Sequence, residues 1–196
     1  MQIIPPGDKQ KIPMTKDTII QFVCFITNLE LDAFIAKWEP YAKKLLHKKE
    51  EPNLQQLVTA SKNKFRYISQ HEWPDRDFTF TFMNERKSEH FPEHNVRVVQ
   101  IGGYVSHVSN KKHTEMEDEH RLIAFIGHNE NDLDFFRQLP LYRHLLIHQA
   151  FYESCMYGYV LEFFVPEKDA GELLLQLKQR PGVEAGIYKD CLVPAT

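Results

Sequence analysis

Cysteine is scarce in this chain and is not arranged for cross-linking. Among the 196 residues only Cys24, Cys155 and Cys191 are cysteines, they lie far apart, and no two have a Cys-x-x-Cys spacing. This excludes the sequence pattern of a zinc knuckle or a redox dithiol and indicates a reducing compartment, so we expect a cytoplasmic protein. A chain of this length buries roughly 70% of its unfolded surface and needs neither a disulfide nor a metal to hold its core.

An apolar leader and a clustered set of basic residues are also missing. Residues 1–17 contain Pro5, Pro6 and Pro13 and no apolar run long enough for a signal peptide or a membrane span, so we interpret them as an extended N-terminal arm. Lys and Arg number 24 against 27 Asp and Glu and are scattered along the chain. Nucleic-acid binding requires a clustered basic face. We therefore expect neither a membrane nor a nucleic acid as a partner.

The chain lacks the short motifs of the common enzyme classes. It contains no nucleophile elbow, phosphate loop, dinucleotide-binding fingerprint or paired-carboxylate motif. The sequence therefore indicates no particular reaction and leaves open whether the protein is an enzyme.

What the chain does contain is a regular order of strands and helices. The run from Thr18 to Ile26 is apolar at both odd and even positions, which indicates a strand covered on both faces. The pair Gly102-Gly103 inside another apolar run predicts a bulge or a close backbone approach. The first half is predicted to form strands at 18–26, 54–60, 65–73 and 96–105, a helix from 31 to about 47, and a second helix after Pro74.

The second half repeats this order, with predicted strands at 121–127, 141–152, 157–165 and 183–192 and predicted helices at 131–139 and 167–180. Each half gives β-α-β-β-α-β, the ferredoxin-like order. We therefore predict an α+β protein made of two tandem ferredoxin-like units, residues 18–107 and 121–196, joined by a polar linker at 108–120. Their antiparallel sheets are expected to face each other, as a sheet pair or as a closed barrel, with room for a cavity between them.

The end of the third predicted strand suggests a family. Its residues Tyr67-Ile68-Ser69-Gln70-His71-Glu72-Trp73 are followed at once by an acidic helix start and Phe78, and Pro181-Gly182-Val183 forms a helix-to-strand turn in the second half. In these features the chain resembles the dimeric α/β-barrel superfamily, which includes antibiotic-biosynthesis-type monooxygenases, haem-degrading monooxygenases and stress-responsive barrel proteins. Members often end this strand with an acidic residue, one further residue and Trp, whereas His71 stands here in the acidic position.

The resemblance implies a barrel built within one polypeptide from halves that other members pair as dimers. We therefore expect a monomer with an internal pseudo-dimer, with a homodimer as the alternative. Haem-degrading members use an Asn near the end of the first strand, a Trp ending the third, and a His on the following helix as iron ligand. Asn28 and Trp73 match the first two positions, but His90 lies too far beyond Trp73, so we expect no haem and no other cofactor.

The histidine pairs do not predict a metal site. His144 and His148 share a face of a predicted strand but lie about 13 Å apart at ~3.3 Å per residue, which is too far to chelate one ion. His90 and His94 have the ligand spacing of a helix, but they flank Pro92, which breaks a helix. We therefore predict no metal site.

His71 is the candidate for chemistry. It shares its strand parity with Phe65, Tyr67, Ser69 and Trp73, and we predict that these residues face the space between the two sheets as a pocket wall. A neutral imidazole in that place accepts a proton from a phenolic or enolic substrate. The candidate ligand-binding residues are Tyr67, Ser69, Trp73, Tyr104 and Tyr159, the last two lining the same space. In the alternative interpretation His71 bonds a neighbour at the strand end, and the two tyrosines are core residues.

Three functional hypotheses follow. The first is a small-molecule-binding α/β-barrel protein of undetermined activity. The second is a cofactor-independent monooxygenase that acts on an aromatic or polyketide-like substrate. The third is a structural module that uses its sheet faces only to associate. A cavity between the sheets that holds a ligand would support the first two hypotheses, and its absence would support the third.

Overall fold

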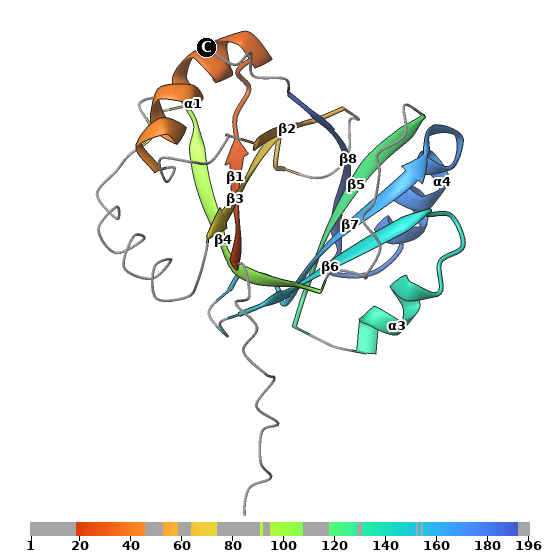
Figure 1. The fold of residues 1–196 in the computed structure, drawn as a ribbon. Helices are drawn as coiled ribbons and strands as arrows, with labels where there is room; N and C mark the ends of the chain where they lie inside the picture. The colour runs from red at the N-terminus through yellow and green to blue at the C-terminus, as the bar shows by residue number, and fades with distance from the viewer. Residues whose placement is uncertain are drawn as a thin grey trace, which may run out of the picture.

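The computed structural model describes residues 19–45, 53–58, 64–73, 91, 95–107, 118–128, 131–151, 153 and 155–191. Its strands are β1 (Ile19–Ile26), β2 (Asn53–Leu57), β3 (Tyr67–Trp73), β4 (Arg97–His107), β5 (Glu119–Ile126), β6 (His144–Ala150), β7 (Tyr159–Pro166) and β8 (Glu184–Asp190). Its helices are α1 (Leu31–Leu45), α3 (Asn131–Arg137) and α4 (Glu167–Lys178) (Figure 1). The predicted arm, the predicted helix after Pro74 and linker residues 108–117 lie outside the described residues, and β5 begins within the last residues of that linker.

The eight strands form one closed antiparallel barrel in the order β1-β3-β2-β8-β5-β7-β6-β4. The two halves are joined at both edges, where β2 pairs with β8 and β4 pairs with β6. Of the two arrangements that the sequence left open, the closed barrel is the one found. The order within the first half, β4-β1-β3-β2, corresponds strand for strand to β8-β5-β7-β6 in the second half.

β1 shows how the apolar pattern produces this arrangement. Its residues Phe22 and Cys24 pack in the cluster that fills the barrel interior, and Val23 and Phe25 pack against α1 on the outside. The prediction of a strand covered on both faces is therefore confirmed. A strand in this position needs apolar side chains at both parities because neither face meets water.

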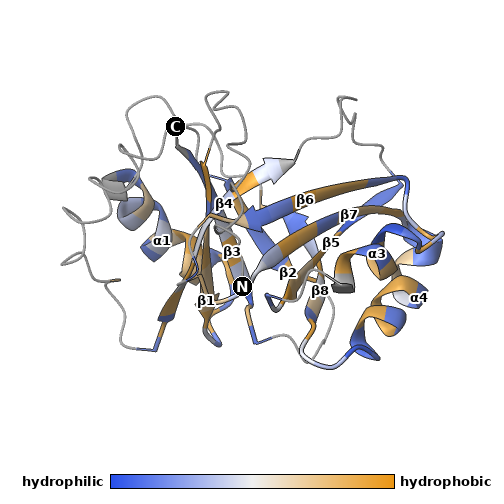
Figure 2. Cartoon of the chain, turned by 90° about the horizontal axis from the view of Figure 1, so that it is seen from below, coloured by the Kyte–Doolittle hydropathy of each residue, from blue (hydrophilic) through white to orange (hydrophobic). Residues whose placement is uncertain are grey.

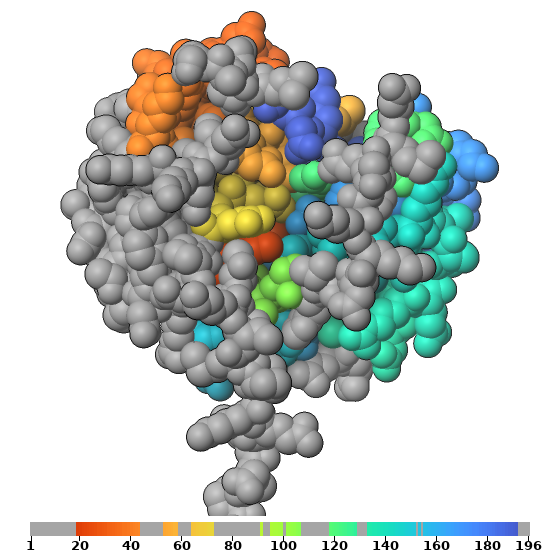
Figure 3. Space-filling view, in the orientation of Figure 1, coloured from red at the N-terminus to blue at the C-terminus, as the bar shows by residue number. Residues whose placement is uncertain are grey.

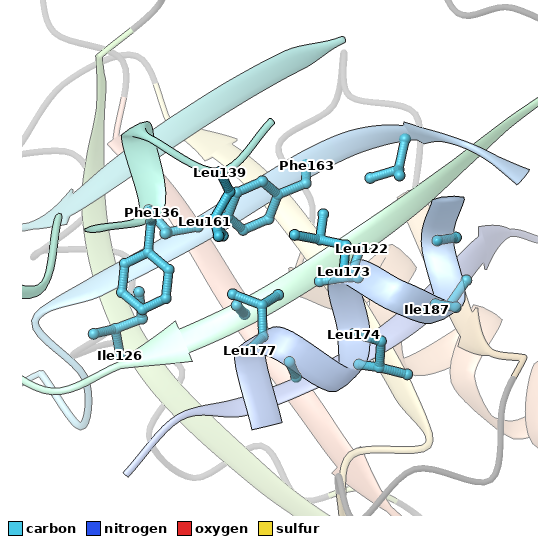
Figure 4. Close-up of a cluster of buried hydrophobic side chains, with 14 of the residues drawn as sticks. Leu122, Ile126, Phe136, Leu139, Leu161, Phe163, Leu173, Leu174, Leu177 and Ile187 are labelled. Carbon is cyan, nitrogen blue, oxygen red and sulfur yellow. The ribbon is translucent and has the colours of Figure 1, made fainter. Parts of the chain in front are cut away.

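The helices cover the outside of the barrel on two opposite sides. α1 lies over the first half, while α3 and α4 lie over the second half (Figure 2). Helix α4 buries Ala170, Leu173, Leu174 and Leu177 against the sheet, at the spacing of one helix face. Figure 4 shows these leucines meeting side chains of β5, β7 and β8. Among the described residues, no helix is both long and apolar enough to span a membrane.

The glycine pair of β4 marks an irregularity in the ladder with β1. The register shifts between Phe22 and Val23 of β1, and Gly102 has a positive φ of 139°. A Cβ atom at Gly102 would collide with the Sγ atom of Cys155. Both the bulge and the close approach that the sequence predicted are present, and only glycine meets both conditions without strain.

Candidate functional site

β3 turns its odd-numbered residues away from the barrel interior. The ring of Tyr67 stacks on Phe34 of α1, with ring centroids 4.0 Å apart, and its hydroxyl donates to the Leu29 carbonyl at 2.9 Å. Ser69 and His71 lie on the same face as Tyr67, because alternate residues of a strand share a face. The prediction that the odd-numbered residues face the space between the two sheets is therefore wrong for Tyr67, Ser69 and His71, whereas Phe65, just before β3, does pack in the interior cluster.

The pairing of β3 with β1 supports this orientation. Val23 and Phe25 of β1 lie opposite Ser69 and Tyr67 and pack on the side of α1. Directly opposed residues of two strands share a face, so all four belong to the helix-covered side. Gln70, on the opposite face of β3, points into the barrel, where other polar groups meet it.

Ser69 and His71 form a buried hydrogen-bonded pair. The Oγ atom of Ser69 lies 2.8 Å from Nε2 of His71, and the two residues are 0% and 4% exposed. Burial lowers the pKa of His71 from 6.5 to about 4, so its imidazole is neutral near pH 7. The neighbour contact expected in the alternative interpretation of His71 is thus present.

The remaining candidate residues lie in different compartments. Tyr104 faces the barrel interior, and its hydroxyl donates to the Tyr157 carbonyl at 3.0 Å. Burial raises the pKa of Tyr104, so it stays protonated. Tyr159 packs on the outside with the core under α4. The prediction that Tyr104 and Tyr159 line one space with His71 is therefore wrong, and the side chain of Trp73 lies outside the described residues.

The helix-covered face of the first half is where the haem position implied by the resemblance would lie. Asn28 is exposed beyond the end of β1, and His90 lies outside the described residues. On this face, Trp38 is only 1% exposed and Phe34 is completely buried by its stacking on Tyr67. The described part of the face is packed core, which does not fit a haem. In the described chain, no group of three or more His, Cys, Asp or Glu residues gathers to hold a metal ion.

A second set of polar side chains lies inside the barrel. Glu162, in the middle of the apolar strand β7, is 4% exposed. Its Oε1 atom lies 2.7 Å from Nε2 of His148 and accepts a hydrogen bond from Nε2 of Gln70 at 2.9 Å. The Nε atom of Arg121 lies 3.8 Å from its Oε2 atom. We call Glu162, His148, Gln70 and Arg121 the interior polar cluster; it joins β3 of the first half to β5, β6 and β7 of the second.

The interior polar cluster keeps Glu162 ionised. Burial alone raises the pKa of a carboxyl group, but the hydrogen bond and charge of His148, the charge of Arg121 and the Gln70 hydrogen bond together lower the pKa of Glu162 below its usual value. Arg121 also pairs with Asp190 at 3.3 Å, which extends the cluster to the end of β8. A buried charge is tolerated when it is paired in this way.

A pocket opens where Arg121 reaches the surface. It has a volume of about 180 Å³ and is lined by residues at the ends of β5, β7 and β8: Glu119, His120, Arg121, Phe164, Tyr188, Lys189 and Asp190. The guanidinium of Arg121 lies over the Phe164 ring, 5.4 Å from its centroid. The space-filling view shows a hollow between the two halves, in which atoms of β1 (red-orange), β3 (yellow) and β4 (green) are visible (Figure 3).

The interior polar cluster is absent from the predictions made from the sequence, although one residue signals it. Glu162 is the only charged residue in the apolar run 159–165, and an isolated carboxylate in a buried strand must find a partner. Its partners are not readable from the sequence, because Gln70 is 92 positions away. The spacing of His148 from His144 raised only the question of a metal site, which it does not satisfy on a strand.

The comparisons with known proteins concern the fold. No family model matches the chain, and no curated protein matches it. Among solved structures, an arginine-to-alanine mutant of chlorite dismutase from Candidatus Nitrospira defluvii is 10% identical, with 89% of this chain and 92% of that chain covered and a TM-score of 0.52. The same enzyme in complex with imidazole is 10% identical, with coverages of 90% and 93% and a TM-score of 0.51.

A third structure, an anthrone oxidase-like protein, is 10% identical over 91% of this chain and 92% of that chain, with a TM-score of 0.52. The chain has the dimeric α/β-barrel fold. The resemblance noted from the β3 residues is therefore confirmed for the fold. At 10% identity, the likeness concerns the fold and not the activity.

Proposed function

We propose that the chain is a small-molecule-binding barrel protein whose ligand binds in the pocket at the ends of β5, β7 and β8. The observation that carries this proposal is the pocket itself, which combines aromatic walls from Phe164 and Tyr188 with charged groups of both signs. Ligand sites typically have this mixture of apolar walls and a few polar groups. Arg121 connects the pocket to the interior polar cluster, so a bound ligand contacts the same network that holds Glu162.

The size of the pocket limits the ligand. A volume of about 180 Å³ is below the ~300–1,000 Å³ of pockets that enclose drug-sized ligands. We therefore expect a ligand of one ring, or the ring-bearing end of a larger molecule.

A pocket-filling variant tests this proposal. We expect phenol and benzoate, used as probes, to shift the NMR signals of Arg121, Phe164 and Tyr188, and we expect His120→Trp to abolish these shifts because the indole occupies the space. Glu172→Trp, on the exposed face of α4, is the matched control and should leave binding unchanged. Signal shifts confined to residues outside the pocket, or binding that persists in the His120→Trp variant, would contradict the proposal.

We also propose that residues 18–107 and 121–196 are tandem ferredoxin-like repeats. The strand orders of the two halves correspond, which supports this view. Because both joining edges, β2 with β8 and β4 with β6, lie within one chain, the pair of repeats supplies its own partner. On this proposal light scattering finds a monomer, and a homodimer is the alternative outcome.

A second function is favoured by a different observation. The Ser69–His71 pair places a neutral imidazole in a buried position, and one structure of similar fold is an anthrone oxidase-like protein. In this proposal the chain is a cofactor-independent monooxygenase. His71 takes a proton from an aromatic or polyketide-like substrate, and the resulting carbanion reacts with dioxygen, which leaves one oxygen atom on the substrate and releases the other as water.

Oxygen consumption tests this second proposal. With anthrone as substrate, the wild-type protein should consume oxygen, and His71→Ala should lower the rate by about 10²-fold or more, the usual contribution of a general base. His128→Gln, a change at an exposed histidine, should keep the wild-type rate. An unchanged rate in the His71→Ala variant, or no oxygen uptake by the wild type, would count against this role.

A further inference from the structure

The pocket at the ends of β5, β7 and β8 lies where two strands stop pairing with each other. The last pair of the β5–β8 ladder is Arg121 with Tyr188, although β5 begins at Glu119 and β8 continues to Asp190. The ionisable residues that line the pocket, apart from Tyr188, lie at or beyond this last pair: Glu119, His120, Arg121, Lys189 and Asp190. A ligand that binds between these strand ends therefore breaks no pair of that ladder.

The carboxylates of the pocket already have cationic partners. The side chain of Glu119 is 3% exposed, and its Oε1 atom accepts a hydrogen bond from Nη1 of Arg143 at 3.3 Å. The Oδ1 atom of Asp190 lies 3.3 Å from Nη1 of Arg121. Glu162 does not line the pocket, and the interior polar cluster holds its carboxylate. None of these three carboxylates therefore needs a cation from a ligand.

The cationic groups of the pocket offer more than its carboxylates do. Lys189 is exposed, and within the part of the chain that the structure describes its ammonium makes no ion pair. The guanidinium of Arg121 lies over the Phe164 ring, which holds its plane in place. A planar guanidinium held in this way presents its N–H groups along its edge, in the geometry that matches a carboxylate. The pocket therefore suits an anionic group better than a cationic one.

Asp190 is an anion that a ligand can replace. Its side chain is 44% exposed, whereas that of Arg121 is 15% exposed. An ion pair with a carboxylate this exposed is weak, because water screens the charges and competes for the carboxylate oxygens. A ligand carboxylate enclosed by the pocket wall is screened less and can form two parallel hydrogen bonds with the guanidinium. Asp190 can then turn its carboxylate into the solvent.

The apolar wall of the pocket accounts for the rest of the ligand. Phe164 and Tyr188 form this wall, and the volume is about 180 Å³. A single aromatic ring suits a space of this kind, and it packs favourably against other aromatic rings. The ring and the anionic group together describe an aromatic carboxylate.

We propose that the pocket selects an aromatic carboxylate, which replaces Asp190 as the partner of Arg121 and is attracted by Lys189. The proposal rests on the proposed function, because it names the class of ligand that the same pocket binds. In this arrangement Lys189 is a specificity-determining residue, and Asp190 is the internal competitor of the ligand. Binding is non-covalent, and no oxidant or reductant takes part.

Three probes of similar size and different charge test this selectivity. At pH 7 benzoate is an anion, benzamide is neutral and benzylamine is a cation. In titrations followed by the NMR signals of Phe164 and Tyr188, we expect benzoate to bind about tenfold more tightly than benzamide, and benzylamine to bind most weakly. Added salt should reduce the preference for benzoate over benzamide, because it screens the charges at the rim of the pocket.

Two variants should change the affinity for benzoate in opposite directions. Lys189→Gln should weaken it by about threefold, the usual worth of an exposed charge pair, and Asp190→Asn should strengthen it by about threefold or more because the competing carboxylate is gone. Neither variant should alter the affinity for benzamide. Lys43→Gln is the matched control, because Lys43 is an exposed lysine of α1 that pairs with Glu39 of its own helix, and it should leave all three affinities unchanged.

The possible outcomes separate this inference from the proposed function. If benzamide binds in the pocket as tightly as benzoate, if benzylamine binds most tightly, or if both variants keep the wild-type affinity for benzoate, selection of a carboxylate is refuted while the binding function stands. If none of the three probes, nor phenol, shifts the pocket signals, both are refuted. A purely structural role of Lys189 and Asp190 would change the affinities for benzoate and benzamide together, which also refutes the inference.

Discussion

Two histidines of this protein are buried in opposite environments. His71 lies on the helix-covered side of β3 with a neutral serine as its hydrogen-bonding neighbour, whereas His148 lies inside the barrel against an ionised carboxylate. Burial disfavours the imidazolium form of His71, whereas Nε2 of His148 lies 2.7 Å from the Glu162 carboxylate. A histidine in the interior of a protein therefore has a chemical character that only its neighbours define.

The burial of His71 predicts a specific pH dependence of stability. Its folded pKa of about 4 lies below the unfolded value of 6.5, so between these values the unfolded chain binds a proton that the folded chain does not. Stability therefore falls as the pH is lowered through this window, by up to about 3 kcal/mol from this group.

Urea unfolding between pH 7 and pH 4 measures this effect. The His71→Gln variant, whose amide takes the place of Nε2 beside Ser69, should show a shallower loss of stability than the wild type. All other titrating groups are common to both proteins, so the difference between the two curves isolates His71. Parallel curves would show that His71 titrates in the folded protein as it does in the unfolded chain.

At the scale of single elements, β4 has an unusual backbone. Among the described strands, it is the one that contains a residue with a positive φ, Gly102. Its bulge lies opposite Phe22 and Val23 of β1, just before Tyr104, where β4 also begins to pair with β6. Gly102 brings the backbone of β4 against Cys155, which lies in the connection before β7. The element thus depends on a glycine for both its conformation and its packing.

Two glycine substitutions are expected to have opposite effects on the stability of the folded protein. Gly102→Ala should destabilise the protein by about 1–3 kcal/mol, because alanine is strained at φ 139° and its Cβ collides with Cys155. Gly171→Ala, in the exposed part of α4 where, apart from the helix backbone and the two chain neighbours, no atom of the described residues lies within 4 Å of the added Cβ, should stabilise it by roughly 1 kcal/mol through helix propensity. Chemical denaturation measures both, and a stabilising Gly102→Ala would contradict the strained conformation.

On the scale of the whole molecule, the barrel interior is a core that both halves share. Phe65 of the first half meets the edge of Phe125 at 5.3 Å, and the hydroxyl of Tyr188 donates to the Phe65 carbonyl at 2.9 Å. The hydrogen bond from Gln70 to Glu162 also crosses between the halves. Neither half can expose this surface without losing contacts of the other, so we expect the halves to unfold together.

Fluorescence and circular dichroism test this cooperativity. Both tryptophans, Trp38 and Trp73, lie in the first half, so fluorescence reports on that half, while far-ultraviolet circular dichroism reports on both. Phe163→Ala, in the outer core of the second half, should lower the melting temperature seen by both probes by about 10 °C. Leu175→Ala, at a 64% exposed position of α4, should change it little. Two separate transitions would show that the halves are independent domains.

The sequence by itself determined the local features of this protein. The doubly apolar pattern of residues 18–26 indicated a strand covered on both faces, the glycines at 102 and 103 indicated a bulge or a close backbone approach, and the order of elements indicated an α+β protein whose antiparallel sheets face each other. These predictions succeeded because each depends on side chains and backbone within one segment, where the period of the pattern directly reflects which residues share a face.

Only the tertiary structure decided which face of each strand points inward. Alternation showed that Tyr67, Ser69 and His71 share one side of β3 and that Gln70 lies on the other. Because both sides of the strand are buried in a barrel covered by helices, alternation did not decide which side faces the interior. The choice followed when the barrel closed through β2 with β8 and β4 with β6, since closure brought Gln70 to Glu162 across 92 positions of sequence. A buried carboxylate gains its stabilisation only from partners that closure places beside it, so the interior polar cluster exists at the level of the whole barrel.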